Sequence, residues 1–261
     1  MISIITATFN AAATVADCLQ SVASQTHSAE HIVIDGVSTD ATLEVVRRNS
    51  PHARIISEPD HGIYDAMNKG IAAAKGTVIG ILNADDFYAS NRVLEKVAKV
   101  FDDPSVDACY GDLLYVAETA AALPVGQKTE AFRTIRYWKS GACAPNKFYW
   151  GWMPPHPTFF VRRHVYERYG LFNLALGSAA DYELMLRFLL KENVAAAYIP
   201  EVLVKMRTGG ASNANMGNRI KANIKDRKAW EVNGLRPYPW TLFLKPVRKI
   251  PQWFNHALHF E

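Results

Sequence analysis

Two neighbouring carboxylates, Asp85 and Asp86, follow an apolar run at Thr77–Leu82. The run predicts a buried strand, which places the aspartates at its carboxyl end. Neighbouring carboxylates repel one another, so the pair favours a divalent cation that compensates both charges. Alternatively, Asp86 caps a helix that begins near Asn91, or the pair marks an ordinary turn. Taken alone, the pair is better explained by this alternative.

A second apolar run, His31–Asp35, also ends in an acidic turn. At the end of a strand, the Asp35 carboxylate can accept hydrogen bonds from the imide or hydroxyl donors of a nucleoside. Ser38 or Thr39 can also be the N-cap of the next helix, with Gly36 supplying a tight turn. Both interpretations can hold at once.

The elements that must position these residues alternate along the first hundred residues. The patterns predict strands at 2–8, 31–35, 54–57, 77–82 and 107–111, and helices at 15–24, 42–49, 63–75 and 92–101. This alternation predicts right-handed crossovers and a mainly parallel α/β sheet, in which ligands bind at the carboxyl ends of the strands. Four polar clusters should therefore gather on one rim: Thr8–Asn10, Asp35–Gly36, Glu58–Asp60 and Asn83–Asp86.

The second half is less regular. Residues 113–151 are rich in aromatics, Gly and Pro, which predicts hairpin and loop material over the site. We expect strands at 157–162 and 195–199, a short helix near Tyr166 and a stronger helix at 180–190. A polar helix at 214–234 and a proline-broken amphipathic segment at 239–259 follow.

Composition limits the class of protein. The chain has 261 residues, of which 49% are hydrophobic and 21% charged, so one α/β domain with an appendage can bury a full core. Its three cysteines are far apart and lack metal spacing, which fits a reduced cytoplasmic interior. No apolar run reaches the roughly 20 residues of a spanning helix. Met1–Phe9 reads as a strand and not as a signal peptide. We expect a cytoplasmic protein that is soluble or bound only to a membrane surface.

Charge is unevenly distributed. The net charge is +4, yet residues from Ala214 onward hold nine Lys or Arg against three Asp or Glu. Since no nucleic-acid-binding motif accompanies this tail, an anionic membrane is the preferred partner over nucleic acid. Residues 239–261 have the composition of an interfacial membrane helix, which would lie at the inner face of the plasma membrane. Alternatively, this segment packs on the catalytic domain or on another subunit.

Four motifs together resemble the family 2 glycosyltransferases of the GT-A fold, an inverting group that builds bacterial surface polysaccharides and glycolipids. They are Thr6–Asn10, the turn Asp35–Asp40, Asp60–Gly70 and Asn83–Asp86. The resemblance covers roughly residues 1 to 210. It implies a Rossmann-like mixed sheet in a catalytic domain at 1–212, with a nucleotide-sugar half at 1–112 and an acceptor half at 113–212. Residues 213–261 would be a helical extension.

The resemblance implies transfer of a sugar from a nucleoside-diphosphate sugar, with a UDP-sugar favoured, to a glycan or polyprenyl-linked glycan. It implies a Mg²⁺ or Mn²⁺ cofactor held by Asp85 and Asp86. The family's DxD motif begins here with Asn83, which leaves Asp85 as the favoured direct ligand. The implied donor-binding residues are Thr6, Ala7, Thr8, Asn10, Asp35, Asp60, Asn68, Lys69, Asn83, Ala84 and Asp85.

The segment Gly177–Arg187 resembles the family's acidic motif, and the resemblance makes Asp181 the general base. Relatives often have Glu at the preceding position, which is Ala180 here. Alternatively, Asp181 is an N-terminal carboxylate favoured by the helix dipole. Glu183 and Arg187 are expected to form a surface pair four residues apart.

The segment Pro154–Phe160 resembles the family's acceptor side, which makes His156 and Trp152 acceptor-binding candidates. The prolines can instead fix an extended turn before a strand. The sequence Gly209–Ser212 fits either a lid over the diphosphate or an ordinary linker.

The motifs also bear on other functions that an α/β sheet can support. No GxxxxGK[ST] loop and no GxGxxG after the first strand occur, which disfavours P-loop enzymes and dinucleotide oxidoreductases. A sugar nucleotidyltransferase would be expected to open with a Gly-rich, basic phosphate loop, which residues 6–14 lack. A non-catalytic sugar-nucleotide-binding protein remains an alternative, because Ala180 replaces the acidic residue of relatives.

Overall fold

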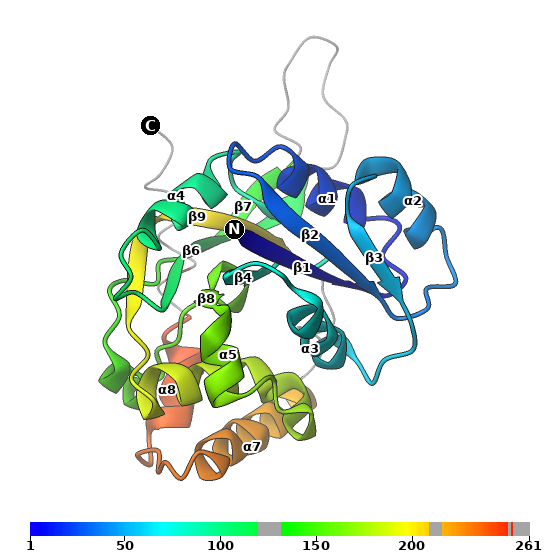
Figure 1. Cartoon of the computed structure of the whole chain (residues 1–261). Coiled ribbons are helices and arrows are strands. Elements are labelled where there is room, and N and C mark those ends of the chain that lie inside the picture. Colours follow the sequence, from blue (N-terminus) through cyan, green and yellow to red (C-terminus); the bar gives the residue numbers. More distant parts are fainter. Residues whose placement is uncertain (120–131, 209–215, 250–251, 253–261) are drawn as a thin grey trace.

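The computed structural model describes residues 1–119, 132–208, 216–249 and 252. Its centre is one twisted mixed sheet with helices on both faces (Figure 1). On one side of the sheet, the strands follow the order β3-β2-β1-β4 and are parallel, as the predicted parallel sheet requires. These strands are β1 (Ile2–Thr8), β2 (Ala29–Asp35), β3 (Arg54–Ser57) and β4 (Val78–Ile81). The connecting helices are α1 (Val15–Ala23), α2 (Thr42–Asn49) and α3 (Ile63–Ala73), and α4 (Val93–Val100) follows.

Alternation of side chains along the strands explains why helices cover both faces. Ile5 and Ile34 pack with α3, whereas Ile4 packs with α1 and α4. Val33 packs with α1 and α2. Successive side chains of a strand point to opposite faces, so an almost uninterrupted apolar run requires cover on both. The crossovers provide it.

The sheet continues past β4 in the order β8-β6-β9-β5, with β7 paired to β6. These strands are β5 (Asp86–Tyr88), β6 (Ala108–Glu118), β7 (Phe132–Trp138), β8 (Phe160–Arg162) and β9 (Ala196–Arg207). β8 is antiparallel to β4 and β6, while β9 is parallel to β6 and antiparallel to β5. The predicted hairpin material is therefore a real β6–β7 hairpin in its described part.

Several strand predictions need correction. The strand predicted at 157–162 is shorter, because residues 156–158 form the 3-10 helix η2 and β8 begins at Phe160. β6 runs beyond Gly111, and β9 runs beyond Ile199. Pro200 lies in β9 where the register with β6 shifts, since a proline cannot donate to the strand ladder. This proline made the sequence pattern end too early. β5 was not predicted at all, because three residues are too few for a period, and its pairing depends on β9.

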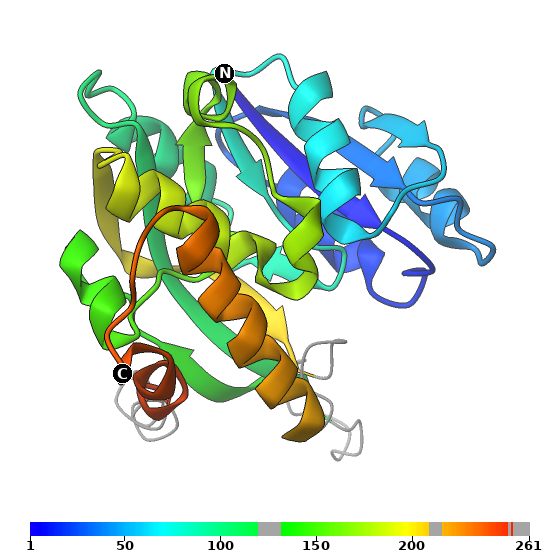
Figure 2. The ribbon, with the colours of Figure 1, turned by 90° about the horizontal axis from the view of Figure 1, so that it is seen from below.

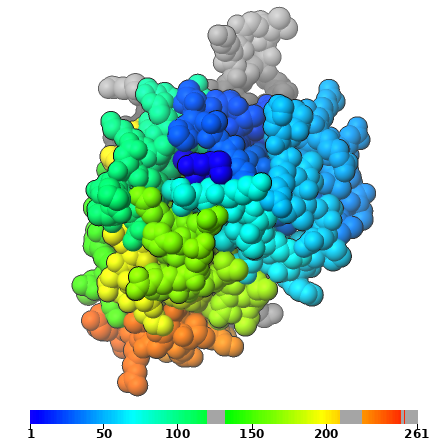
Figure 3. Space-filling model, in the orientation of Figure 1, coloured from blue at the N-terminus to red at the C-terminus, as the bar shows by residue number. Residues whose placement is uncertain are grey.

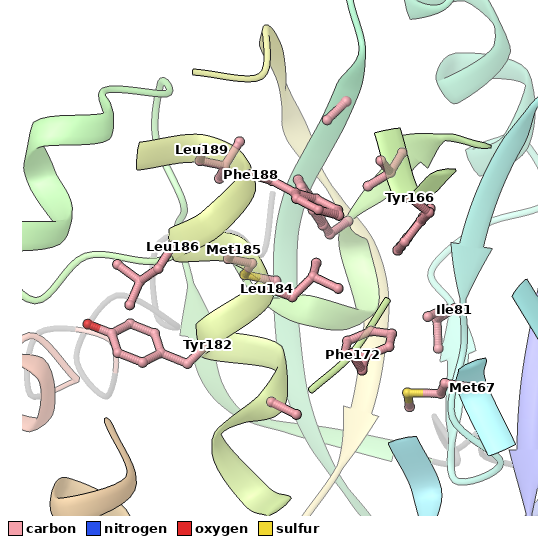
Figure 4. Close-up of a cluster of buried hydrophobic side chains, with 14 of the residues drawn as sticks. Met67, Ile81, Tyr166, Phe172, Tyr182, Leu184, Met185, Leu186, Phe188 and Leu189 are labelled. Atoms are coloured by element: carbon pink, nitrogen blue, oxygen red, sulfur yellow. The ribbon is translucent and has the colours of Figure 1, made fainter. Parts of the chain in front are cut away.

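Short helical elements occupy the second half of the chain, which is the predicted acceptor half. They are η1 (Pro145–Trp150), η2 (His156–Thr158), α5 (Arg163–Tyr169), η3 (Leu174–Ala179), α6 (Ala180–Met185) and η4 (Leu186–Lys191). The helix predicted at 180–190 is thus α6 followed by the wider turn η4. Its residues Tyr182, Leu184 and Phe188 are buried. The Phe188 ring lies edge-on to Tyr166, whereas the Tyr182 ring points to the other side of the helix, away from Phe172 and Met67 (Figure 4). Burial of this cluster fixes the position of the helix that carries Asp181.

The C-terminal helices α7 (Met216–Val232) and α8 (Thr241–Val247) lie against the acceptor half (Figures 2 and 3). Trp230 of α7 is fully buried, and its indole N–H donates to the Tyr182 hydroxyl at 3.0 Å. The predicted extension therefore contributes to the core of the domain. Within the described residues, no helix is both long and apolar enough to cross a membrane.

Candidate functional site

A cavity of about 810 Å³ opens where the strands end. It lies at the carboxyl ends of β1, β4, β6 and β9 and at the start of α3. Parallel register places Thr8 beside Asp35, so the ends of neighbouring strands meet at one edge. The predicted rim is confirmed. The cavity is lined by Ala7, Thr8, Phe9, Asn10, Ala11, Thr14, Asp60, Gly62, Ile63, Ala66, Asn83, Ala84, Asp85, Val116, Ala117, Glu118, Arg207 and Thr208.

Seven of the residues predicted to bind the donor line this cavity, and four do not. Those that line it are Ala7, Thr8, Asn10, Asp60, Asn83, Ala84 and Asp85. Those outside its lining are Thr6, Asp35, Asn68 and Lys69. Thr6 is fully buried, and its hydroxyl contacts the His31 ring nitrogen at 3.1 Å, beneath the rim.

Asp35 is fully buried and is occupied by protein donors. Its carboxylate accepts hydrogen bonds from the hydroxyls of Thr8 (3.2 Å), Ser38 (2.5 Å) and Ser57 (2.7 Å), and from the Ser38 amide (3.1 Å). Burial alone would raise the pKa of Asp35, but these hydrogen bonds outweigh it and lower the pKa. In this structure Asp35 holds the ends of β1, β2 and β3 together.

Close packing brings Asp60 to the rim beside Asp35. A Cβ atom at Gly36 would lie 2.6 Å from Asp60 Oδ2, so only glycine allows this approach. The other oxygen, Asp60 Oδ1, accepts the Gly62 amide at 2.8 Å, ahead of α3. Asn10 joins the rim turns, since its side-chain oxygen accepts the Thr39 amide at 2.9 Å.

The two aspartates at the end of β4 have different surroundings. Asp85 lines the cavity, whereas Asp86 is fully buried and accepts the Asn83 side-chain amide at 3.0 Å. Burial raises the pKa of Asp86 well above its usual range, and the Asp85 charge raises it further. Asp86 is the first residue of β5 and does not line the cavity, so the prediction that both aspartates face a cation is supported for Asp85 alone.

The cavity wall offers carboxylate oxygens, at Asp85 among others, that could take part in holding a divalent cation. Among the described residues, no three His, Cys, Asp or Glu side chains group into a complete metal site. A Mg²⁺ ion needs only one or two carboxylates when substrate phosphates supply further oxygens. Asp85, an oxygen donor on the cavity wall, meets this smaller requirement.

Arg207 is a cavity residue that the sequence patterns did not identify. Its guanidinium contacts the Asp17 carboxylate, donates to the Asp85 carbonyl at 3.1 Å and lies 3.5 Å from Glu118. It also lies over the Phe87 ring at 5.3 Å. Although 9% exposed, Arg207 places a fixed positive charge on the wall that carries Asp85. Its position just before Gly209–Ser212 was the available signal, but those glycines lie outside the described residues.

Asn68 and Lys69 support the rim from α3. The Asn68 amide donates to the Phe172 carbonyl at 3.0 Å and accepts the Phe172 N–H at 2.9 Å. Lys69 donates to the Pro59 carbonyl at 2.6 Å and pairs with Glu58 at 3.0 Å. Both side chains are engaged by protein groups outside the cavity lining, which gives them a structural role here.

Asp181 lies beside the cavity, near residues that adjoin its wall. Burial raises the pKa of Tyr64, and Asp181 raises it further. Burial also raises the pKa of Tyr115. The charge of Arg136 lowers this pKa, and the charges of Asp86 and Asp181 raise it further. Tyr64 and Tyr115 directly follow or precede the lining residues Ile63 and Val116. Asp181 itself does not line the cavity.

The two acceptor candidates differ in burial. His156 is half-buried near Asp181, and its ring lies edge-on to Phe172 at 5.5 Å. Burial lowers the pKa of His156, while Asp181 opposes this effect. Trp152 is 5% exposed, and its indole N–H donates to the Ser140 carbonyl at 2.8 Å. In this structure Trp152 is a core residue, packed edge-on to Phe148.

The expected surface pair between Glu183 and Arg187 is instead buried. The guanidinium Nε and the carboxylate lie 2.9 Å apart, with side-chain exposures of 13% and 3%. Arg187 also donates to the carbonyls of Tyr169 and Leu171, and Glu183 accepts the Asn233 amide at 3.1 Å. The spacing was predicted correctly, but α7 covers the pair, which the local sequence does not show.

The sheet order and the cavity at its carboxyl rim define an α/β protein of the doubly wound class, in which ligands bind at the ends of the strands. The family model for glycosyl transferase family 2 matches residues 3–170, so the chain belongs to this family. A PGL/p-HBAD biosynthesis glycosyltransferase from Mycobacterium bovis is 30% identical over 220 residues, which are 82% of this chain and 79% of the relative. Chondroitin synthase from Pasteurella multocida is 35% identical over 113 residues, or 42% of this chain and 12% of that protein.

Solved structures of glycosyltransferases share the fold. TarS from S. aureus, in complex with UDP, superposes with a TM-score of 0.61 at 14% identity, covering 100% of this chain and 72% of that one. A mannosyltransferase from Pyrobaculum calidifontis, in complex with GDP-Man and Mn²⁺, gives 0.61 at 19% identity, covering 98% and 70%. The GT-A fold is therefore confirmed.

Proposed function

We propose that this family 2 glycosyltransferase transfers a sugar from a nucleoside-diphosphate sugar to an acceptor hydroxyl, with inversion at the anomeric carbon. The observation that carries the proposal is the cavity at the carboxyl rim, whose wall combines the Asp85 carboxylate with the Arg207 guanidinium. A carboxylate can hold a cation and a guanidinium can face phosphate oxygens, so the wall suits a diphosphate.

A UDP-sugar is the favoured donor. TarS has been solved with UDP and with UDP-GlcNAc, and the Pyrobaculum mannosyltransferase with GDP-Man. The rim offers Thr8, Asn10 and Asp60 as polar partners, and the exposed ring of Phe9 lines the same cavity. These groups can hydrogen-bond to a nucleoside and cover one of its faces.

Asp85 would hold a Mg²⁺ or Mn²⁺ ion in this reaction. When bound, the cation supplies neutralisation of the charge that develops on the departing diphosphate. Arg207 would face the same phosphates from the cavity wall, where Asp17 and the Asp85 carbonyl hold its guanidinium in place, although Asp17 and Glu118 compensate part of its charge. Asp86, buried behind the rim, fixes Asn83 by accepting its amide.

Asp181 would accept the proton of the acceptor hydroxyl as that hydroxyl attacks the anomeric carbon. The carboxylate stands at the start of α6, on the acceptor half, whereas the cation-binding wall belongs to the end of β4. Attack from the face opposite the leaving group gives inversion. His156, beside Asp181, would line the acceptor pocket.

A glycan or polyprenyl-linked glycan is the proposed acceptor. Residues 239–261 are the proposed peripheral membrane contact at the cytoplasmic face.

A thermal-shift screen against UDP-, GDP- and dTDP-sugars, with and without Mn²⁺, tests this function. A ligand that binds only the folded state raises the melting temperature by mass action. We expect one donor to raise it more with Mn²⁺ than without. In the Asp85→Ala variant the Mn²⁺-dependent part of the shift should be lost. An unchanged Mn²⁺-dependent shift in that variant would remove Asp85 from the metal site, and no shift with any donor would contradict the proposal.

A further inference from the structure

Two groups can be distinguished among the exposed large apolar side chains of the described residues, and others, such as Leu171, Leu174 and Ile224, lie outside both groups. Phe9, Val37 and Ile63 lie at the rim of the cavity or its turns. A second group lies far along the chain, on η1 and around α8: Trp150 (51% exposed), Tyr238 (46%), Trp240 (44%), Phe243 (69%) and Val247 (38%). The second group has no place in the donor site.

This second group forms one continuous surface. The rings of Trp150 and Trp240 lie 6.0 Å apart, and those of Tyr238 and Trp240 lie 5.1 Å apart. Trp240, Phe243 and Val247 follow each other at helical spacing, so they share a face of α8. We call these five residues, together with Lys147 and Arg248, the aromatic-basic surface. Arg248 Nη1 lies 3.5 Å from the Trp150 carbonyl, which ties the two segments together.

The opposite side of α8 anchors this surface to the domain. Thr241 is fully buried and donates to the Tyr149 carbonyl at 2.7 Å, and Leu242 is 8% exposed. Lys245 pairs with Asp226 at 2.7 Å and lies 3.6 Å from the centre of the Tyr182 ring. The packing alternative for this helix is thus confirmed for its inner face. Its outer face is left with exposed aromatic rings.

Charge distinguishes the two segments that build the surface. Residues 131–166 contain six Lys or Arg, residues 232–260 contain four, and neither segment contains Asp or Glu. The acidic residues of the adjoining part of α7 are Asp226, which pairs with Lys245, and Glu231. Exposed Trp and Tyr rings among cations are the composition that proteins place at the boundary between lipid headgroups and acyl chains.

We propose that the aromatic-basic surface binds an anionic lipid bilayer. The surface is composite, so η1 takes part in binding together with the C-terminal segment. It backs onto α6, because Lys245 and Trp230 both contact Tyr182, the residue after Asp181. Bound in this way, the protein holds its acceptor half, and not the parallel strands of the donor half, at the lipid.

Vesicle flotation of the full-length protein tests the proposal without any sugar donor, so its outcome does not depend on the proposed transfer. We expect flotation with vesicles of phosphatidylcholine and phosphatidylglycerol, and little with phosphatidylcholine alone. Phe243→Glu should lower the bound fraction about tenfold or more. It removes an exposed ring that would enter the bilayer, and it adds a negative charge that the anionic lipids repel. Arg248→Gln should lower it about fivefold. Addition of salt should weaken binding.

Ile224→Glu is the matched control, since Ile224 on α7 is similarly exposed at 65% but lies outside the aromatic-basic surface. It should float like the parent protein. Trp150→Ala separates the composite surface from the C-terminal segment and should reduce flotation. Trp253 belongs to the predicted segment 239–261 but lies outside the described residues. Equal flotation of the Phe243→Glu and parent proteins, or loss of flotation in Trp253→Ala but not in Phe243→Glu, overturns the proposal. So does a parent protein that binds neither vesicle type.

Discussion

The donor half and the acceptor half hold their site residues by different means. In the donor half, cavity residues follow the ends of parallel strands, and the supporting contacts are hydrogen bonds within the rim, as at Asp35. In the acceptor half, Asp181 stands on a short helix, α6, that is held from outside. Arg187 ties it to the backbone at Tyr169 and Leu171.

This difference separates two kinds of dependence. A side chain at the end of a strand inherits its position from the register of the sheet, so a single change in the rim has local consequences. A side chain on α6 depends on a buried ion pair and on Trp230 of α7, and these contacts join segments about 50 residues apart. Mutations in the acceptor half should therefore disturb folding and chemistry more widely.

The largest effect should come from Asp181→Asn. Removal of a positioned base costs on the order of 10² to 10⁴ in rate, so release of nucleoside diphosphate during transfer should fall by that range. The donor-induced thermal shift should persist, because Asp181 does not line the donor cavity. Asp102→Asn, on an exposed loop, is the control and should keep its activity. Near-normal turnover of Asp181→Asn would exclude it as the base.

Arg187→Met should destabilise the fold by about 3–5 kcal/mol, because it leaves the Glu183 carboxylate buried without its partner. Urea unfolding followed by circular dichroism measures this free energy. The double variant Arg187→Met with Glu183→Met should recover part of the loss, since both buried charges are then absent. Lys96→Met, which breaks the more exposed pair with Glu201, should change stability little. Equal losses at both pairs would contradict the argument that burial of the Glu183–Arg187 pair makes the acceptor half sensitive.

Asp35→Asn should cost about 1–3 kcal/mol at neutral pH, because the carboxylate is the shared acceptor of the rim. Since folding lowers the pKa of Asp35, its contribution to stability is fully present above the unfolded pKa of about 3.9. That contribution is lost as pH falls through the lower folded pKa. Unfolding midpoints of the variant and parent should converge in acid, and a gap that widens in acid would contradict this assignment.

Asn68→Ala should have the smallest effect of these, about 1–2 kcal/mol, because it leaves the Phe172 N–H and carbonyl without the Asn68 amide. Hydrogen exchange should show faster exchange of the Phe172 amide, with the ends of β1 and β2 unaffected. Asn49→Ala, whose amide only contacts its own helix and the Gln20 side chain, is the control. A reduced donor-induced thermal shift without faster exchange would instead favour direct donor binding by Asn68.

Repeating patterns made much of the donor half predictable. The bounds of β1, α2 and β3 agree with the structure, because each is a run of regular period bounded by turn residues. The rim followed from the same pattern, since parallel strands must end at one edge. Asp85 was identified for this reason. The patterns could not separate Asp85 from Asp86, because the side of a turn that faces solvent depends on β5 and β9.

Only the tertiary structure decided the roles that depend on distant cover. Glu183 and Arg187 have the spacing of an exposed helical pair, yet Asn233 and α7 enclose them. Trp150 is exposed, yet Trp152, two residues later in the same aromatic stretch, is buried. Arg207 reaches the cavity because β9 pairs with β6 beyond Pro200. The sequence by itself determined local period, turns and net charge. Burial depends on which remote segment covers a residue, so it appears only when the chain is folded.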